Sequence, residues 1–392
     1  MRMSTRLSKV PAYPFARWGD ACRKAVARGI DVIRLDVGNP DLPPPELAIA
    51  ALSAAANRPR AHGYPGFRGT SDLREAIADY YAGRFGVTLD PESQIVTLLG
   101  SKEGIVNLSL ALLDPEDVAL IPDPGYAPYA RGALLAGATP AFVRLRQAAG
   151  WLPDLKGIPE DDVRRARILW LNYPSNPTGA CADLGFLADV VAFARRHDLL
   201  LCHDAPYTDV AFDGFAPPSV LQVPGADEVA VEFHSLSKTF NMAGWRVGMA
   251  VGNRDALALL ARLKSNVDSG IPIPVQAAAT AALRTDRAWI DARNAIYKER
   301  LDRLAAALVS AGLPVKPPRA SLYLWVPAPG GACAQTCAER LLEATGIAVA
   351  PGTFFGPAGE GYLRVSATAS AERIEDAVDR LCRLPRGWFD QA

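Results

Sequence analysis

The chain has 392 residues, more than one hydrophobic core usually supports, so two domains are expected. Its 42 basic and 42 acidic residues give a formal net charge of zero, which argues against bulk electrostatic attraction to nucleic acid or to an anionic membrane. Hydrophobic residues make up 49% of the sequence, as is ordinary for a globular protein. No apolar run is long enough to span a membrane, and the N-terminal stretch "MRMSTRLSKVPAYPF" lacks the apolar segment of a secretory signal.

The six cysteines and four histidines are scattered along the chain. The sequence contains no CxxC pair, and its histidines lack the spacing of metal ligands. Neither a disulfide framework nor a metal site is therefore indicated, and the histidines are interpreted as structural. A reduced, cytoplasmic protein is the expectation.

Short apolar runs alternate with helical patterns through the middle of the chain. The runs predicted as buried strands are 94–100, 117–123, 167–174, 199–207, 228–237 and 245–252. Several are continuously apolar, as expected where both faces of a sheet are covered. Residues 183–197 are predicted as a helix with Asp183 as its N-cap. This alternation predicts an α/β fold in which three layers (α, β, α) surround a mostly parallel sheet.

The pattern changes towards the C-terminus. A long helical region is predicted from Pro274 to about residue 310. Short strands are then predicted at 321–327, 347–351 and 362–367, interleaved with helices near 333–345 and 371–384. These elements predict a second, smaller α/β domain. The predicted division is an N-terminal segment of residues 1–44 that packs with the small domain, a large domain of 45–285 and a small domain of 286–392.

The familiar loop motifs of phosphate binding and nucleophilic catalysis, GxxxxGK[ST] and GxSxG, do not occur in the sequence. Instead, polar residues follow the predicted strands: Asn176 in "NYPSNPTG", Asp204 and Tyr207 in "HDAPY", and Ser235 and Lys238 in "SLSK". Ligands of open parallel sheets bind outside the carboxyl ends of the strands, so these side chains could converge in one crevice. Taken alone, each also has an ordinary structural role, as a turn former, a cap or a surface charge.

In this order, "NPTG", "HDAPY" and "SLSKTFNMAGWRVG" resemble the fold-type I, pyridoxal-phosphate-dependent aminotransferases of class I/II. The resemblance extends over nearly the whole chain, from "LDVGNPDLPPPE" to "YLRVSA". It implies an aspartate aminotransferase-like large domain and an enzyme that moves an amino group between an amino acid and a 2-oxo acid. It also implies a homodimer whose active sites are shared between subunits.

The resemblance implies a role for each residue at the strand ends. Lys238 matches the lysine that holds the aldehyde of pyridoxal phosphate as a Schiff base and later moves a proton. Asp204 matches the partner of the ring N–H, which keeps the ring an electron sink. Asn176 and Tyr207 match the donors to the phenolic oxygen. Catalytic roles are therefore expected for Lys238, Asp204 and Tyr207.

The phosphate group needs several donors and positive charge. The resemblance implies Ser235, Arg246 and the start of a helix at Ser101 and Lys102 as its ligands. Tyr64, in "HGYPGFRG", matches a tyrosine that reaches the phosphate of the neighbouring subunit. A packed loop tyrosine is the alternative.

Three further positions match residues of the family that touch the cofactor ring or the substrate. Tyr126 matches the aromatic side chain that stacks on the ring, with core packing as the alternative. Arg364 matches the arginine that grips the substrate's α-carboxylate, with a structural ion pair as the alternative. Gly38 lets the backbone approach the same carboxylate, and Asn176 is expected to contact the substrate as well.

Within the family, "YPGFRGTSDLREAI" and "NVDSGIP" look most like LL-diaminopimelate aminotransferases. LL-diaminopimelate and 2-oxoglutarate are therefore the first substrate hypothesis, and Lys102 could read a distal polar group. Alanine-, aspartate- and N-succinyldiaminopimelate-type aminotransferases stay open, as does a C–S lyase or cyclase on the same scaffold. A regulator or binding protein built on this fold is disfavoured, because too few residues precede the family pattern for a DNA-binding module.

Overall fold

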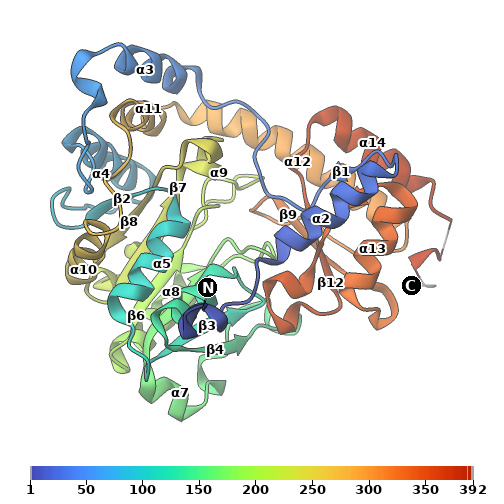
Figure 1. Cartoon of the computed structure of the whole chain (residues 1–392), viewed down its shortest axis with the longest axis horizontal. Helices are drawn as coiled ribbons and strands as arrows, with labels where there is room; N and C mark the ends of the chain where they lie inside the picture. The colour runs from blue at the N-terminus through green and yellow to red at the C-terminus, as the bar shows by residue number, and fades with distance from the viewer. Residues whose placement is uncertain (1, 386, 390–392) are drawn as a thin grey trace.

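The computed structural model describes residues 2–385 and 387–389. Its centre is a seven-stranded sheet in the order β2–β8–β7–β6–β5–β3–β4 (Figure 1). The strands are β2 (Ile95–Leu98), β3 (Val118–Asp123), β4 (Thr139–Arg144), β5 (Ala166–Asn172), β6 (Leu200–Asp204), β7 (Ala230–Ser235) and β8 (Gly248–Gly252). β8 runs antiparallel to both of its neighbours, and the remaining neighbours pair in parallel. The predicted mostly parallel sheet is confirmed.

Helices cover both faces of this sheet. One face packs against α5 (Ser101–Leu112), α6 (Pro128–Ala136) and α10 (Arg254–Lys264). The other packs against α4 (Ser71–Phe85), α8 (Leu184–Arg196) and α11 (Ile273–Leu283), with α3 (Glu46–Ala56) beside α11. Because successive strand residues point to opposite faces and both faces are covered, inner strands such as β3 and β7 are buried along their whole length. The predicted three-layer α/β architecture is confirmed.

Smaller sheets lie beside the large one, on the right of Figure 1. β9 (Tyr323–Pro327), β12 (Tyr362–Ser366) and β11 (Ala350–Pro351) form an antiparallel sheet, and β1 (Ile33–Arg34) pairs in parallel with β10 (Ile347–Ala348). The surrounding helices are α2 (Pro14–Ala27), α12 (Arg287–Ser310), α13 (Ala334–Thr345) and α14 (Ala371–Cys382). Trp18 of α2 shares a core with Leu341 and Ile374, so the N-terminal segment packs against C-terminal elements. The predicted domain bounds themselves stay a prediction.

Several predicted elements differ in the structure. The helical region expected from Pro274 to about 310 is present, but as two helices, because the chain breaks after α11 and restarts as α12, where Asp286 accepts a hydrogen bond from the Ala288 N–H. The stretch 347–351, predicted as one strand, is divided between two sheets. The edge strand β4 was not predicted, because its partly exposed residues and Pro140 give a weak strand signal.

The element that carries Lys238 is also different from its prediction. The strand predicted to run to residue 237 ends at Ser235, and the next residues form a one-turn helix, α9 (Leu236–Thr239). The side chain of Ser235 accepts a hydrogen bond from the Ser237 N–H and so begins this turn. Two short helices, α1 (Thr5–Ser8) and α7 (Glu160–Arg165), complete the α-helices of the described chain. No helix among the described residues combines the length and apolar character that crossing a bilayer requires.

Candidate active site

A cavity of about 370 Å³ opens at the carboxyl edge of the parallel strands, between the large sheet and the C-terminal elements. Every predicted site residue except Tyr64 lines it: Gly38, Ser101, Lys102, Tyr126, Asn176, Asp204, Tyr207, Ser235, Lys238, Arg246 and Arg364. The side chain of Tyr64 lies outside this cavity and is 91% exposed. The structure therefore brings together residues that are hundreds of positions apart in the sequence.

The topology explains this convergence. β5, β6 and β7 are parallel neighbours, and Asn172 at the end of β5 is paired in register with Asp204 at the end of β6. Each chain segment leaves its strand at the same edge of the sheet, which is where ligands of such sheets bind. Asn176, Asp204 and Lys238 lie at or just after these strand ends.

Asp204 is buried and only half satisfied. Tyr129 donates a hydrogen bond to its Oδ2 at 2.7 Å, whereas Oδ1 has no hydrogen-bond partner among the described residues. Burial raises the pKa of Asp204 to about 6, although the Tyr129 hydroxyl opposes this rise. A buried carboxylate oxygen without a partner, in a side chain that lines a cavity, fits a ligand that brings its own N–H group.

Lys238 reaches the cavity from α9, and its Nζ donates a hydrogen bond to the backbone oxygen of Gly38. Burial lowers the pKa of Lys238. Tyr323 opposes this decrease, whereas Arg364 and Arg246 add to it. The lysine therefore loses its proton more easily than a surface lysine, as a nucleophilic amine requires.

Tyr207 forms a hydroxyl pair with Tyr323, with 2.9 Å between the two oxygens. Burial raises the pKa of Tyr207, so its hydroxyl keeps a proton that it can donate. Tyr323 lies so close to Gly38 that a Cβ on that glycine would come within 1.9 Å of the tyrosine oxygen. The glycine is therefore required by this close approach.

One end of the cavity is suited to an anion. The first turn of α5 presents Ser101 and Lys102 there, preceded by Gly100 with a φ of 83°. Arg246 lies beside this turn and donates to the backbone oxygens of Ala243 at 2.8 Å and of Leu99 at 3.2 Å. A helix N-terminus next to a guanidinium group attracts phosphate or carboxylate.

Arg364 is a second guanidinium group that lines the cavity. Its guanidinium donates to Asn176 Oδ1 at 2.7 Å and to the backbone oxygen of Asp36 at 2.6 Å. Its Nε–H has no acceptor within the described part of the chain. The guanidinium carbon also lies 4.1 Å from the centroid of the Tyr323 ring. A buried guanidinium with an unused donor suits a carboxylate ligand.

Several lining or supporting residues were missed by sequence reasoning, and four of them are tyrosines or a phenylalanine that support or line the site. Tyr129 and Tyr323 support Asp204 and Tyr207 from distant elements, and nothing in their local sequence marks them. Tyr13 and Phe15 line the cavity from the N-terminal segment. The Nζ of Lys102 lies 4.5 Å from the Tyr13 ring centroid, and burial lowers the pKa of this lysine. The aromatic stretch "AYPF" was the available signal for this contact.

The sequence matches the aminotransferase class I and II family over residues 30–381. LL-diaminopimelate aminotransferases from Dehalococcoides mccartyi and Moorella thermoacetica are each 46% identical to this chain, and the alignments cover 98% of it and 99% and 98% of their own lengths. The substrate-bound structure of BacF from Bacillus subtilis superposes with a TM-score of 0.93 at 35% identity, covering 98% of both chains. A probable N-succinyldiaminopimelate aminotransferase from Thermus thermophilus superposes with a TM-score of 0.89 at 41% identity, covering 94% of this chain and 99% of its own.

The raised pKa of Asp204 predicts a pH-dependent cost in stability. Because the folded pKa of about 6 lies above the ordinary 3.8, the cost is absent below pH 4 and develops as pH rises through 6. At pH 7 we expect Asp204→Asn to have a higher melting temperature than the cofactor-free wild type. The corresponding gain in free energy of unfolding is at most about 3 kcal/mol. Thermal unfolding between pH 4 and 7 measures this difference, and a difference that does not grow with pH would contradict the assignment.

Proposed function

The chain belongs to the class I and II aminotransferases, which are pyridoxal-phosphate-dependent enzymes, and we propose that LL-diaminopimelate is its amino donor and 2-oxoglutarate its acceptor. The proposed donor rests on 46% identity, over 98% of this chain, to enzymes named LL-diaminopimelate aminotransferase. The acceptor is the partner that the resemblance in sequence implies. The placement in amino-acid biosynthesis follows from the same relatives.

Pyridoxal phosphate is the proposed cofactor, and the residues present suit it. When bound, it supplies an electron sink for the negative charge that develops on the substrate's Cα. The unpartnered Oδ1 of Asp204 would accept the ring N–H, which the carboxylate can do as an anion near neutral pH. Asn176 and Tyr207 would donate to the phenolic oxygen, and Tyr126 would lie on the ring face.

The phosphate group would bind at the anion-binding end of the cavity. Ser101 and Lys102 offer the N–H groups of the first turn of α5, and Arg246 offers a guanidinium. Ser235 lines the same cavity and adds a hydroxyl group. Positive charge together with several fixed donors is the environment that a phosphate dianion needs.

Lys238 would perform the proton transfer. Its lowered pKa favours the neutral amine, which can take the proton from the substrate's Cα and return it later. Arg364 would hold the α-carboxylate with the donor that it leaves unused, assisted by Asn176 and the backbone at Gly38. At the other side of the cavity, Lys102 would contact the distal end of the donor, whose second carboxylate carries negative charge.

A second candidate donor, N-succinyldiaminopimelate, is favoured by one observation. The solved structure with that probable activity shares 41% of its sequence with this chain. Both candidate donors carry a distal carboxylate, so the cavity residues alone favour neither of them. The distal amine distinguishes them, because only LL-diaminopimelate keeps it as a charged ammonium group.

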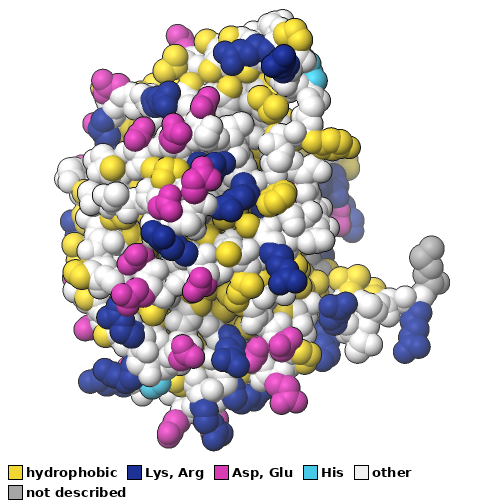
Figure 2. Space-filling model, turned by 90° about the vertical axis from the view of Figure 1, so that its left-hand side faces the viewer, with side chains coloured by type: hydrophobic (Ala, Val, Ile, Leu, Met, Phe, Trp, Pro, Cys, Tyr) yellow, Lys and Arg dark blue, Asp and Glu magenta, His cyan; other side chains and the backbone are white. Residues whose placement is uncertain are grey.

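We also propose a homodimer in which Tyr64 completes the partner's site. Tyr64 is 91% exposed, and the loop that carries it contacts Gly270. Other exposed large apolar side chains are Leu47 and Ile49 of α3, Phe67 of the loop that carries Tyr64, and Val267, which follows α10. Figure 2 shows apolar side chains lying between mixed basic and acidic ones on the face that carries α3 and α4. Such a face is suited to a second copy of the chain. The cytoplasmic location stays a prediction.

Absorbance spectroscopy tests the donor. The protein loaded with pyridoxal phosphate is titrated with LL-diaminopimelate, N-succinyl-LL-diaminopimelate, alanine, aspartate and glutamate, one at a time. We expect LL-diaminopimelate to convert the lysine-bound form of the cofactor into its amine form at the lowest concentration. Faster conversion by the N-succinyl compound would favour the second candidate, and conversion by none would contradict aminotransfer from these donors.

Hybrid dimers test the sharing of sites. Lys238→Ala removes the reactive lysine of its own subunit, and Tyr64→Ala removes the tyrosine that is proposed to complete the partner's site. Neither variant alone should support full turnover. If Tyr64 acts across the interface, mixing and re-equilibrating the two variants restores one intact site in each hybrid dimer, about a quarter of wild-type activity overall. Activity that stays at the mean of the two separate variants would place Tyr64 in its own subunit's site or outside the mechanism.

A further inference from the structure

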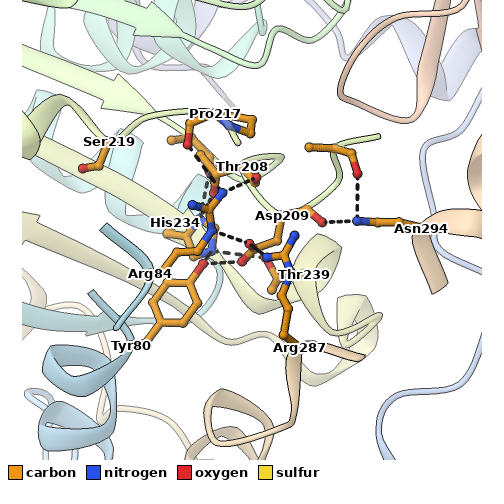
Figure 3. Close-up of polar contacts among 12 residues, drawn as sticks. Tyr80, Arg84, Thr208, Asp209, Pro217, Ser219, His234, Thr239, Arg287 and Asn294 are labelled. Carbon is orange, nitrogen blue, oxygen red and sulfur yellow. Dashed lines mark hydrogen bonds and ion pairs between the residues drawn. The ribbon is translucent and has the colours of Figure 1, made fainter. Parts of the chain in front are cut away.

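A buried polar cluster lies where the loop after β6 meets α4, α9 and α12 (Figure 3). Its centre is Asp209, which has no exposed surface. Asp209 Oδ1 accepts hydrogen bonds from Arg84 Nε at 2.9 Å and from Arg287 Nη1 at 2.7 Å, and Tyr80 donates to Oδ2. Although burial opposes ionisation, Arg84 and the other partners hold the pKa of Asp209 below its usual value. The cluster is therefore anchored on a charged carboxylate.

His234 connects this cluster to both strand ends of the active site. Its Nδ1 lies 2.8 Å from the backbone oxygen of Ala205, which can only accept, so Nδ1 carries the proton. Its Nε2 lies 3.1 Å from the hydroxyl of Thr239 and is therefore the acceptor of that pair. Burial lowers the pKa of His234, so the ring is neutral at pH 7. Ala205 directly follows Asp204, and Thr239 directly follows Lys238.

Arg293 of α12 binds the lysine's own backbone. Its side chain is buried. Its Nη1 donates hydrogen bonds to the backbone oxygen of Lys238 and, at 2.7 Å, to the backbone oxygen of Thr239. Its Nη2 donates to the backbone oxygen of Asp209 at 2.7 Å. Burial lowers the pKa of Arg293 to about 10, so the guanidinium still carries its charge at pH 7. The guanidinium group of Arg293 thus joins the single helical turn that carries Lys238 (α9, the lysine turn) to the loop that carries Asp209.

These contacts supply what the lysine turn lacks. α9 is a single helical turn, closed by a hydrogen bond from Phe240 N to Leu236 O at 3.0 Å, and one isolated turn is unstable in water. The last carbonyl groups of a helix have no partners within it, and those of Lys238 and Thr239 are the ones that Arg293 binds. An apolar residue could fill the same space without the cost of burying a charge, but it would leave these oxygens without that donor.

We propose that Arg293 is a positioning residue for Lys238: by binding the two carbonyl groups that end the lysine turn, it fixes where the lysine side chain enters the cavity. The inference rests on the proposed role of Lys238 as the reactive lysine. Its consequence is kinetic, because a displacement of a reacting group by about 1 Å can slow a reaction on the order of 100-fold. Substrate affinity should change little, because Arg293 does not line the cavity.

The chain offers a matched control on the same helix. Arg300 also belongs to α12 and is buried to a similar degree, with 5% of its surface exposed against 3% for Arg293. It binds the Asp41 carboxylate at 2.7 Å and the backbone oxygen of Ala367 at 3.4 Å, two partners that lie outside α9. Arg300→Lys therefore reproduces the change in side chain and in burial but leaves the lysine turn untouched.

The test compares Arg293→Lys with Arg300→Lys in the enzyme loaded with pyridoxal phosphate. Arg293→Lys is expected to lower kcat about ten-fold or more with KM unchanged, because one ammonium group cannot hold oxygens on two sides. It is also expected to shift the pH at which the absorbance of the lysine-bound cofactor changes. Arg300→Lys should leave kcat and this pH profile unchanged. Thermal unfolding of both variants reports whether they are folded.

Wild-type kcat and a wild-type pH profile in folded Arg293→Lys would overturn the inference, as would equal losses in Arg300→Lys. If Arg293→Lys does not fold, Arg293→Gln, which keeps one neutral donor group, replaces it in the test. Failure of both variants to fold would make Arg293 a stability residue and overturn the inference too.

Lys238→Ala separates the proposed function from the positioning role of Arg293. Full activity in that variant would contradict the proposed function and this inference together, whereas a normal Arg293→Lys beside an inactive Lys238→Ala would contradict the inference alone.

Discussion

The carboxylate of Asp204 is buried with one oxygen bound and the other left open, and the geometry around the cavity depends on this arrangement. Tyr129 holds Oδ2 and is itself fixed by stacking on Trp170, with ring centroids 4.9 Å apart. Asn172 donates to the backbone oxygen of Asp204 at 2.7 Å. A rigid, half-satisfied carboxylate destabilises the folded chain, and a ligand that supplies an N–H group and a positive charge removes that cost on binding.

The charges of the cavity complement this arrangement. Among the described residues that line it, Asp204 is the one carboxylate, whereas Lys102, Lys238, Arg246 and Arg364 are basic. The excess of positive charge suits a ligand set that includes a phosphate and at least one carboxylate. It also bears on Lys238, because two neighbouring guanidinium groups lower the pKa of its amine in addition to burial. The same surroundings therefore attract the anions and favour the neutral lysine.

Elements and site residues that follow from local sequence patterns could be predicted from the sequence. Pairs of residues that are far apart in the sequence could not. The parallel strands, the helix capped by Asp183 and the polar strand ends follow from local runs and spacing, and all are present in the structure. Tyr129 is 75 residues from Asp204, Tyr323 is 116 from Tyr207, and Arg293 is 55 from Lys238. No periodicity marks such pairs. The break between α11 and α12 was missed because Asp286, a helix cap, interrupts a continuous helical pattern.

The central claim is that Lys238, and not the other lysine of the cavity, forms the covalent bond with the cofactor. Borohydride reduction of the protein loaded with pyridoxal phosphate, followed by proteolysis and mass spectrometry of the peptides, tests it directly. The account predicts that the mass of the reduced cofactor is found on the peptide that contains Lys238. A modified peptide that contains Lys102 instead, or no modified peptide at all, would contradict it.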